Sequence, residues 1–413
     1  MQIRIFRDTP TTVGRAITFL ALVSLATSVP LSTAFADDTH HNDRYDTRSK
    51  QSQRGRGRTL KPRARRDLAR TGLTQYLGDF RPSQAESLPE GWTSYTFDSD
   101  GGQGPICIDG SDFRVFVQER SHEDVVIFLN GGGACWQGAY NCAFSASTSP
   151  PGPSGIFSDS LIESDGAVTY NPFKTFSKVF VSYCDGSVFA GDNEVADLTF
   201  PGGPVRYHRG VRNISAAFDL TESLFPYARN VLLTGASAGG YGATGLSAAL
   251  VRFVYPEARI RFFNDSGPLN NPAFVSALTA QAEDWQTAQF VPRSCPTCSP
   301  FNQPSEIIKW WLANDRGLRA GLFSFDGDAV IRFFTAVPTA AMYRSLLLDV
   351  HDPINARFPR RYKRFIVNGE AHTIVGGTGF YLATVNDIPL YEWLEDLVRG
   401  GRNYVDLVAP AVP

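Results

Sequence analysis

The stretch Val231-Leu-Leu-Thr-Gly-Ala-Ser-Ala-Gly-Gly-Tyr-Gly-Ala243 decides the fold of this 413-residue chain. Its apolar beginning predicts a buried strand, and the small residues at 241–253 predict a helix. Between them lies Gly235-Ala-Ser-Ala-Gly239, a G-x-S-x-G sequence at a sharp turn. Such a turn pushes the serine hydroxyl out of the sheet, and its glycines let strand and helix pass closely. We predict that Ser237 is a nucleophile; the alternative is a glycine-rich turn that merely contains a serine.

Further apolar runs surround this stretch and predict strands separated by helical segments. The expected strands lie at 124–129, 178–183, 259–263, 320–325 and 363–368, and helical spacing occurs at 208–225 and 387–399. Strands that alternate with helices predict a mostly parallel central sheet with helices on both faces, in the α/β class. Ligands of such sheets bind at the carboxyl ends of the strands. We expect one catalytic domain over residues 72–413.

The first 71 residues differ in composition from this body. A segment with three arginines precedes an apolar stretch at 16–29, which is too short to span a bilayer well, and Ala34-Phe-Ala36 supplies an A-x-A cleavage site. We expect residues 1–36 to be a signal peptide of a secreted protein, extracellular or periplasmic, with an uncleaved anchor as the alternative. Residues 37–71 are polar and arginine-rich, which predicts a disordered basic leader or tether. An arm for nucleic acid or an anionic surface is the alternative.

The charge distribution separates the leader from the body. The chain has a net charge of −2, of which residues 1–36 contribute +2 and residues 37–71 contribute +6, so the body carries about −10. An acidic body argues against nucleic acid as its main ligand. We expect no stable membrane insertion and a monomer.

All six cysteines follow the expected signal peptide, and an even number in an exported chain predicts disulfides. Cys295-Pro-Thr-Cys298 could be a redox pair, but no thioredoxin-like strand–helix pattern surrounds it. A zinc site would need two further ligands, and none is near in the sequence. We therefore interpret all six as structural cystines.

Ser237 needs a base and an orienting acid, and with a G-x-S-x-G turn these follow in the order Ser, acid, His. Two histidines follow the serine. His372 lies in a glycine-rich loop after a strand, which favours a catalytic imidazole, whereas the Asp-Val-His-Asp-Pro sequence predicts a surface turn at His351. For the acid we favour Asp326, which follows the strand at 320–325, with Asp265 and Asp328 as the alternatives.

Stabilisation of an oxyanion requires backbone N–H groups directed at one point. The residue after the nucleophile, Ala238, supplies one such group. Gly132 and Gly133, in the run Asn130-Gly-Gly-Gly133 at the end of a strand, could supply the others. A flexible turn is the alternative for this run.

Several motifs occur together in one part of the chain. They are Phe128-Leu-Asn-Gly-Gly-Gly-Ala-Cys135 with Asn141-Cys142, Asn171-Pro-Phe173, Val181-Ser-Tyr-Cys-Asp-Gly-Ser187, Tyr207-His-Arg-Gly-Val-Arg212 and Gly235-Ala-Ser-Ala-Gly-Gly240. In this combination the chain resembles the pectin acetylesterase/Notum family of secreted serine esterases. The likeness extends from about Pro105 to Gly267 and returns at Phe325-Asp326 and at His372.

This resemblance implies an α/β-hydrolase fold, hydrolysis of carboxylic esters, and no metal or other cofactor. It also implies the disulfides Cys107–Cys184 and Cys135–Cys142, which leaves Cys295 to pair with Cys298, and it supports Asp326 as the acid. The implied partner is an acyl-ester substrate, most simply an O-acetylated polysaccharide such as pectin.

The sequence departs from the family near the expected acyl pocket. Ala134 follows the glycine run where the family has an aromatic residue, and Pro268 follows Asp265-Ser-Gly267 where the family also has one. Longer acyl esters or polyesters are therefore a second substrate class. The same scaffold could also belong to a non-catalytic secreted binding protein, and the same triad could serve a peptidase or amidase.

Overall fold

The computed structural model describes residues 59–159, 162–164, 167–268, 275–298 and 305–411, which all fall within one compact unit. The expected signal peptide at 1–36 lies outside the described residues.

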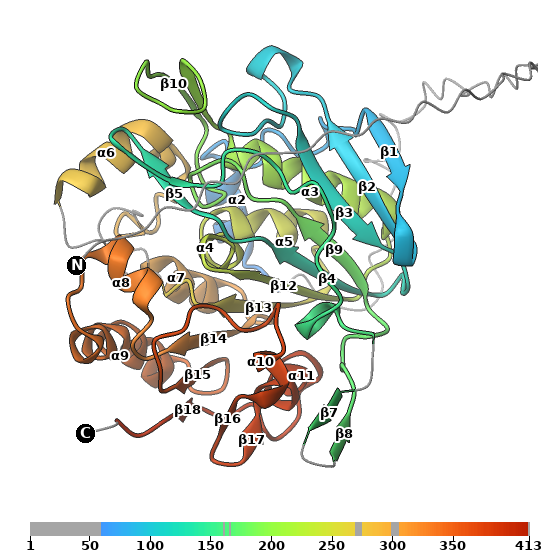
Figure 1. Ribbon diagram of the computed structural model, residues 1–413, viewed down its shortest axis with the longest axis vertical. Helices are drawn as coiled ribbons and strands as arrows, with labels where there is room; N and C mark the ends of the chain where they lie inside the picture. Colours follow the sequence, from blue (N-terminus) through green and yellow to red (C-terminus); the bar gives the residue numbers. More distant parts are fainter. Residues whose placement is uncertain (1–58, 160–161, 165–166, 269–274, 299–304, 412–413) are drawn as a thin grey trace, which may run out of the picture. The chain divides into compact units, whose positions relative to one another are not determined.

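A ten-stranded sheet forms the centre of this unit. In spatial order its strands are β1 (Gln84–Ser87), β2 (Trp92–Phe97), β3 (Phe113–Gln118), β9 (Ser177–Val181), β4 (Asp124–Leu129), β12 (Asn230–Ala236), β13 (Arg259–Asp265), β14 (Arg319–Phe325), β15 (Tyr362–Val367) and β18 (Leu407–Val408) (Figure 1). The seven strands from β9 to β18 are parallel, and β1, β2 and β3 add an antiparallel edge. The predicted mostly parallel sheet is confirmed.

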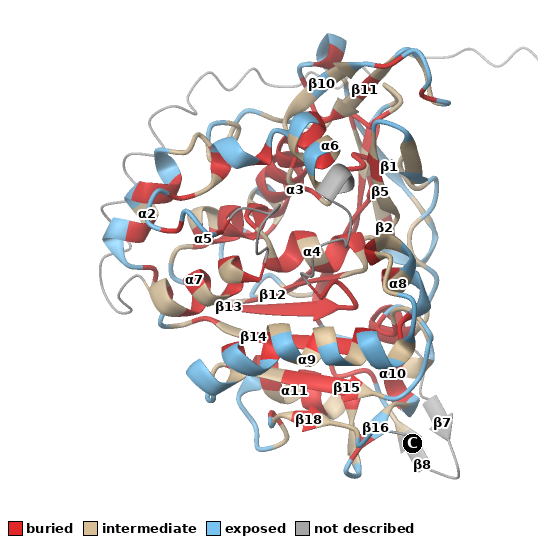
Figure 2. Cartoon of the chain, turned by 90° about the vertical axis from the view of Figure 1, so that its left-hand side faces the viewer, coloured by how far each residue is buried: buried red, intermediate tan, exposed pale blue. Residues whose placement is uncertain are grey.

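Helices cover both faces of the sheet. They are α2 (Pro62–Ala69), α3 (Gly210–Leu224), α4 (Ala238–Thr244), α5 (Leu250–Val254), α6 (Val275–Trp285), α7 (Glu306–Asn314), α8 (Ala329–Thr335), α9 (Ala340–Arg357), α10 (Gly379–Leu382) and α11 (Leu390–Arg399). Residues of α2, α3, α5, α7 and α9 share one core, and residues of α10 and α11 share the other. The strands contribute alternate side chains to the two cores: Val231 and Leu233 of β12 to the first and Leu232 to the second. Figure 2 shows the buried strands inside this helical cover.

Four two-stranded hairpins lie outside the main sheet. They are β5 (Gly133–Trp136) with β6 (Ala139–Cys142), β7 (Ile162–Ser164) with β8 (Ala167–Thr169), β10 (Asn193–Ala196) with β11 (Val205–His208), and β16 (Thr384–Val385) with β17 (Ile388–Pro389). The β5–β6 hairpin begins at Gly133, so the glycine run after β4 leads directly into it.

The folded body begins earlier than the expected boundary at residue 72. Within the predicted leader, helix α2 buries Ala64 and Leu68, and Leu60 before it is also buried. Leu60 forms a bridge with Asp315, and the backbone N–H of Lys61 donates to Asn314 O at 2.9 Å. The prediction of disorder was wrong here because it was based on the basic composition. Leu60, Ala64 and Leu68, spaced four residues apart, form a buried apolar stripe on an otherwise charged segment.

Two local expectations are also corrected. The single helix expected at 241–253 is divided into α4, a 3-10 turn at Ser247–Ala249, and α5. His351 is not in a surface turn: it lies inside α9 with 1% of its surface exposed. Its Nε2 donates to Pro268 O, and its Nδ1 accepts from the Tyr362 hydroxyl, both at 2.7 Å.

Among the described residues, no helix has both the length and the apolar character needed to cross a membrane.

Candidate active site

Ser237 occupies a strained turn between β12 and α4. Its φ and ψ are 57° and −119°, a region that residues with a side chain rarely occupy. The turn is tight: a Cβ added to Gly239 would lie 1.9 Å from Leu129 O, and one added to Gly235 would lie 2.4 Å from Gly239 O. The two glycines of the motif therefore permit a close approach that no other residue allows. Ser237 itself is half-buried at the carboxyl end of the sheet.

His372 lies in the loop that follows β15 and is held by Asp328. Its Nδ1 is 2.7 Å from Oδ2 of Asp328, a carboxylate whose side chain is fully buried. A carboxylate accepts, so Nδ1 carries the proton and Nε2 is left with its lone pair. Nε2 is buried and has no hydrogen-bond partner among the described residues. The ring thus has the tautomer required of a general base.

The loops after β14 and β15 run side by side, which brings Asp328 and His372 together. The N–H of Gly327 donates to Gly369 O at 2.9 Å, and the N–H of Ala329 donates to Glu370 O at 3.0 Å. Asp328 also begins helix α8, because its Oδ1 accepts from the N–H groups of Val330 and Ile331. Helix capping fixes one carboxylate oxygen and leaves the other for the imidazole.

The favoured acid, Asp326, does not lie in this position. Its Oδ2 pairs with Arg344 of α9 at 2.6 Å, and its Oδ1 accepts from the N–H of Gly369. Both carboxylate oxygens of Asp326 are therefore engaged away from His372. The structure therefore places Asp328, and not the favoured Asp326, against His372.

Asp265, the remaining candidate, connects the serine turn to the histidine loop. Its backbone oxygen accepts from Ser237 N at 2.8 Å, and its Oδ2 accepts from the N–H groups of Ile374 and Val375 at 2.9 Å each. Burial raises the pKa of Asp265 to about 6, although the two backbone N–H groups oppose that rise. The carboxylate thus positions the backbone two and three residues after His372.

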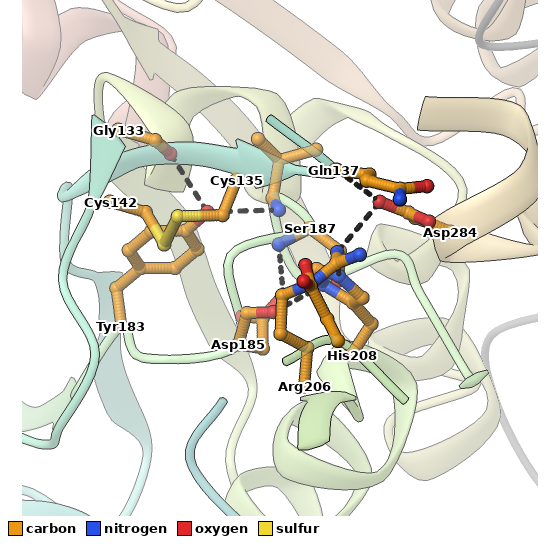
Figure 3. Close-up of a disulfide and its surroundings, with 12 residues drawn as sticks. Gly133, Cys135, Gln137, Cys142, Tyr183, Asp185, Ser187, Arg206, His208 and Asp284 are labelled. Carbon is orange, nitrogen blue, oxygen red and sulfur yellow. Dashed lines mark hydrogen bonds and ion pairs between the residues drawn. A yellow bond between two sulfur atoms is a disulfide. The ribbon is translucent and has the colours of Figure 1, made fainter. Parts of the chain in front are cut away.

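The glycine run lies against the serine turn. A Cβ on Gly131 would be 3.1 Å from the Ser237 Cβ, so the two segments are in contact. Within the described part of the chain, no acceptor takes the backbone N–H of Gly132 or of Ala238. Gly133 has a φ of +79° and its carbonyl accepts from the Tyr183 hydroxyl at 2.8 Å (Figure 3). The predicted oxyanion residues therefore share one end of the sheet with Ser237.

Comparison with known proteins points to one family. The family model named Pectinacetylesterase matches residues 93–289. Pectin acetylesterase 11 of Arabidopsis thaliana is 30% identical over 174 residues, which are 40% of this chain and 43% of that protein. The chain is a relative of the pectin acetylesterases. The match spans less than half of the length of that plant protein.

Solved structures extend the likeness in fold to most of the chain. Two crystal forms of the Wnt deacylase Notum from Drosophila superpose with TM-scores of 0.56 and 0.55, at 15% sequence identity. They cover 80% and 81% of this chain and 97% of the Notum chain. The predicted resemblance to the pectin acetylesterase/Notum family and the α/β-hydrolase-like fold are confirmed.

The segment that matches the family model contains Ser237, Ala238 and the glycine run, but it ends before Asp328 and His372. These two residues are brought to the serine end of the sheet by β14 and β15. The structure, rather than the matched sequence, therefore distinguishes Asp328 from Asp326.

The cysteines pair as the resemblance implies, in the disulfides Cys107–Cys184, Cys135–Cys142 and Cys295–Cys298. Cys135–Cys142 closes the β5–β6 hairpin that begins at Gly133. No described cysteine is free.

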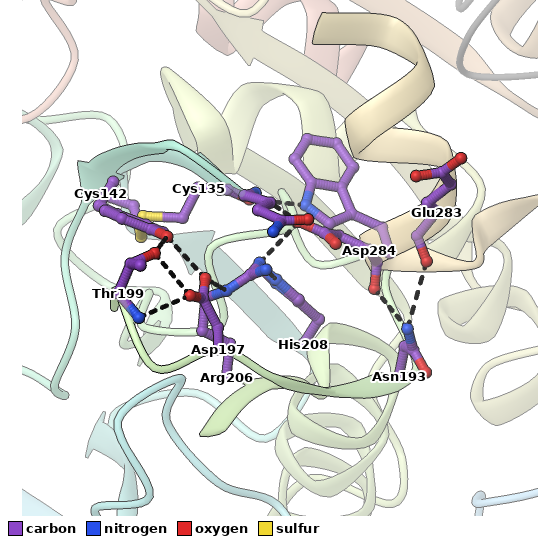
Figure 4. A network of polar contacts seen from close by, with 12 residues as sticks. Cys135, Cys142, Asn193, Asp197, Thr199, Arg206, His208, Glu283 and Asp284 are labelled. Carbon is purple, nitrogen blue, oxygen red and sulfur yellow. Dashed lines mark hydrogen bonds and ion pairs between the residues drawn. A yellow bond between two sulfur atoms is a disulfide. The ribbon is translucent and has the colours of Figure 1, made fainter. Parts of the chain in front are cut away.

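A buried polar network that the sequence analysis did not identify supports the same hairpin. Arg206, with a fully buried side chain, pairs with Asp197 at 2.9 Å and with Asp284 at 2.6 Å (Figure 4). Asp284 also accepts from the N–H of Gln137 at the hairpin tip, and Trp285 donates to Cys135 O at 2.8 Å. The sequence signal that could have found it was the alternation of β11, which places Arg206 and His208 on the same buried face.

His208 is a neutral member of this network. Burial lowers its pKa to about 4, and the neighbouring guanidinium of Arg206 adds to that effect. Its Nδ1 donates to the backbone oxygen of Asp185 at 3.0 Å, which leaves Nε2 to accept from Arg206 at 2.9 Å. The histidine has a structural role in this network.

Proposed function

We propose that this protein is a serine esterase that hydrolyses carboxylic esters with Ser237, His372 and Asp328. The observation that carries the proposal is the 2.7 Å contact of His372 Nδ1 with buried Asp328, in a ring whose Nε2 has no partner among the described residues. The strained turn at Ser237 and the names of the relatives support the same function.

In the proposed mechanism, Ser237 Oγ attacks the ester carbonyl while His372 Nε2 takes its proton. Asp328 holds the imidazole in the required tautomer and stabilises the imidazolium. The N–H groups of Gly132, Gly133 and Ala238 stabilise the oxyanion of the tetrahedral intermediate. His372 then gives its proton to the departing alcohol. Water attacks the acyl-enzyme by the same route and releases the acid.

The proposed substrate is an O-acetylated polysaccharide outside the cell, such as pectin. The family description and the plant relative support the acetyl ester, and the three disulfides support an oxidising, extracellular environment. Longer acyl esters are the second candidate, because Ala134 and Pro268 stand where the family has aromatic residues.

The test compares initial rates on p-nitrophenyl esters from acetate to palmitate for the wild type, Ser237→Ala and Ser223→Ala. Ser223 is an exposed residue of α3 and serves as the matched control. The proposal expects loss of turnover by a factor on the order of 10⁴ or more in Ser237→Ala alone. Rates that peak at acetate favour the polysaccharide substrate, and rates that peak at long chains favour the second candidate. Equal rates in all three proteins would reject the nucleophile.

A further inference from the structure

A cavity with a volume of about 610 Å³ opens at the carboxyl end of the sheet, next to the candidate catalytic residues. Its size is in the range of pockets that bind small molecules. It is lined by Phe128 and Phe180, near the ends of β4 and β9, and by residues of the loops around Gly152 and Thr378. None of the residues assigned to the mechanism lines it directly.

The lining of the cavity is mostly apolar and aromatic, with Asn130, Thr373 and Thr378 as its polar side chains. The rings of Phe128, Phe157 and Phe180 pack against one another with centroids 5.0 to 5.9 Å apart, and Phe325 and Ile374 complete the apolar lining. Among the described residues that line the cavity, none carries a charge. An ionised group held against these rings would lose part of its hydration and find no counter-charge in the lining. The cavity therefore selects an uncharged occupant with an apolar face.

The position of the cavity identifies the part of the substrate that it receives. It is lined by Ala236, which directly precedes Ser237, and by Ala371 and Thr373, which flank His372 on both sides. In ester hydrolysis the histidine returns its proton to the oxygen of the departing alcohol. The group attached to that oxygen must therefore lie beside His372, which is where the cavity opens.

We propose that this cavity binds the alcohol portion of the ester, and that this alcohol is an uncharged ring with an apolar face. The inference rests on the proposed function and refines its substrate class. An ionised galacturonate ring is a poor occupant, whereas a ring without a free carboxylate can pack against the phenylalanines. The acyl group, on the other side of the reacting carbonyl, has no part in this cavity.

The first experiment varies the two halves of the ester separately. Benzyl acetate, 4-carboxybenzyl acetate and ethyl acetate share the acyl group, and ethyl esters from acetate to octanoate share the alcohol. The inference expects kcat/KM for benzyl acetate to be at least about tenfold above that of both other acetates, because burying a ring removes a large apolar area from water. It expects no comparable gain along the ethyl ester series.

A variant at the mouth of the cavity provides the second experiment. Thr378 is exposed, lines the cavity, and makes no side-chain cap at the start of α10. Thr378→Phe should reduce the ratio of kcat/KM for benzyl acetate to kcat/KM for ethyl acetate about tenfold or more. Thr384→Phe, at an exposed position of β16 that does not line the cavity, is the matched control and should leave this ratio unchanged.

The deacylation rate distinguishes a blocked alcohol site from a general structural defect, because a general defect would slow deacylation as well. The alcohol has left before water attacks, so Thr378→Phe should deacylate the acetyl-enzyme at the wild-type rate after a p-nitrophenyl acetate burst. Added benzyl alcohol should intercept the acetyl-enzyme to form benzyl acetate in the wild type and in Thr384→Phe, but much less in Thr378→Phe.

The outcomes separate the inference from the function on which it rests. Rates that follow acyl length and ignore the alcohol, or a slowed deacylation in Thr378→Phe, would overturn the alcohol site while leaving the esterase in place. A preference for 4-carboxybenzyl acetate would overturn the uncharged occupant. Absence of Ser237-dependent turnover on every ester would reject the proposed function and this inference with it.

Discussion

Nδ1 of His372 lies 2.7 Å from Oδ2 of Asp328, while Oδ1 of the same carboxylate caps helix α8. One buried side chain therefore sets both the start of a helix and the orientation of the imidazole. Because the helix N–H groups hold one oxygen, the carboxylate cannot rotate away from the ring without losing two hydrogen bonds. This is the kind of rigid support that a general base needs.

Substitution of the two neighbouring aspartates should have opposite effects on catalysis. In Asp328→Asn the side-chain oxygen can still cap α8, but its amide would donate to Nδ1 and place the imidazole proton on Nε2. We expect kcat to fall on the order of 10⁴-fold with little change in secondary structure, as judged by circular dichroism. In Asp326→Asn the His372–Asp328 contact is untouched, so kcat should remain within a few-fold while the ion pair with Arg344 is lost. The reverse pattern would restore Asp326 as the acid.

Asp265 should make the stability of the protein depend on pH. Burial raises its folded pKa to about 6, above the ordinary value of 3.8, so the folded state holds the proton more tightly than the unfolded state. Its contribution to stability is full below pH 3.8 and is lost as the pH rises through about 6. The free energy of unfolding of wild type minus that of Asp265→Asn should therefore fall by about 2 kcal/mol between pH 4 and pH 7. Urea titrations at each pH measure this difference, and a difference independent of pH would contradict the assignment.

The buried Arg206 network should contribute far more to stability than an exposed ion pair does. Arg206→Gln leaves Asp197 and Asp284 buried without their cation, and removal of one partner from such a network costs about 3 to 5 kcal/mol. Arg229 pairs with Glu123 on the surface, with 73% and 54% of the side chains exposed, so Arg229→Gln should cost no more than about 1 kcal/mol. Chemical denaturation of the two variants provides the comparison. Similar losses would mean that the network is not specifically stabilising.

The sequence was sufficient for features whose signal is local. The strand, the turn at Ser237 and the helical start after it are encoded in thirteen consecutive residues, and the parallel sheet follows from apolar runs of strand length. The contacts that distinguish Asp326 from Asp328 are not encoded locally in the sequence. They involve Arg344, which lies 18 residues after Asp326 and forms an ion pair with it. They also involve the loop after β15, whose backbone is hydrogen-bonded to the loop that contains Asp328. Two aspartates separated by one glycine give no sequence signal that could decide between them.

The other wrong predictions concern segments in which one sequence feature obscured the signal of another. Arginine content hid the apolar stripe of α2, and Pro353 suggested a turn although α9 continues through it and buries His351. The Arg206 network was missed because its partners Asp197 and Asp284 are far apart in sequence, one in the loop after β10 and the other in α6. Tertiary contacts of this kind override local propensity.

The β5–β6 hairpin contains two glycines with the same positive φ and different surroundings. Gly133 and Gly138 both have a φ of +79°, a region that disfavours alanine at either position, typically by about 1 to 2 kcal/mol. A Cβ on Gly133 would lie 2.0 Å from Asn141 O, whereas a Cβ on Gly138 would have no atom within 4 Å. Gly133→Ala must therefore shift the backbone at 133 or 141, whereas Gly138→Ala need not shift its surroundings. The backbone N–H of residue 133 is one of the proposed oxyanion donors.

We expect Gly133→Ala to lower kcat by about 10²- to 10³-fold, the loss associated with one oxyanion donor, and Gly138→Ala to retain kcat within a few-fold. Steady-state kinetics on p-nitrophenyl acetate, with thermal unfolding of both variants measured in parallel, separates catalysis from stability. Because both positions have a positive φ and only the Cβ at Gly133 meets the backbone, a difference in kcat reports the position of the Gly133 backbone. Equal kcat values in the two variants would remove Gly133 from the oxyanion site and leave Gly132 and Ala238 as its donors.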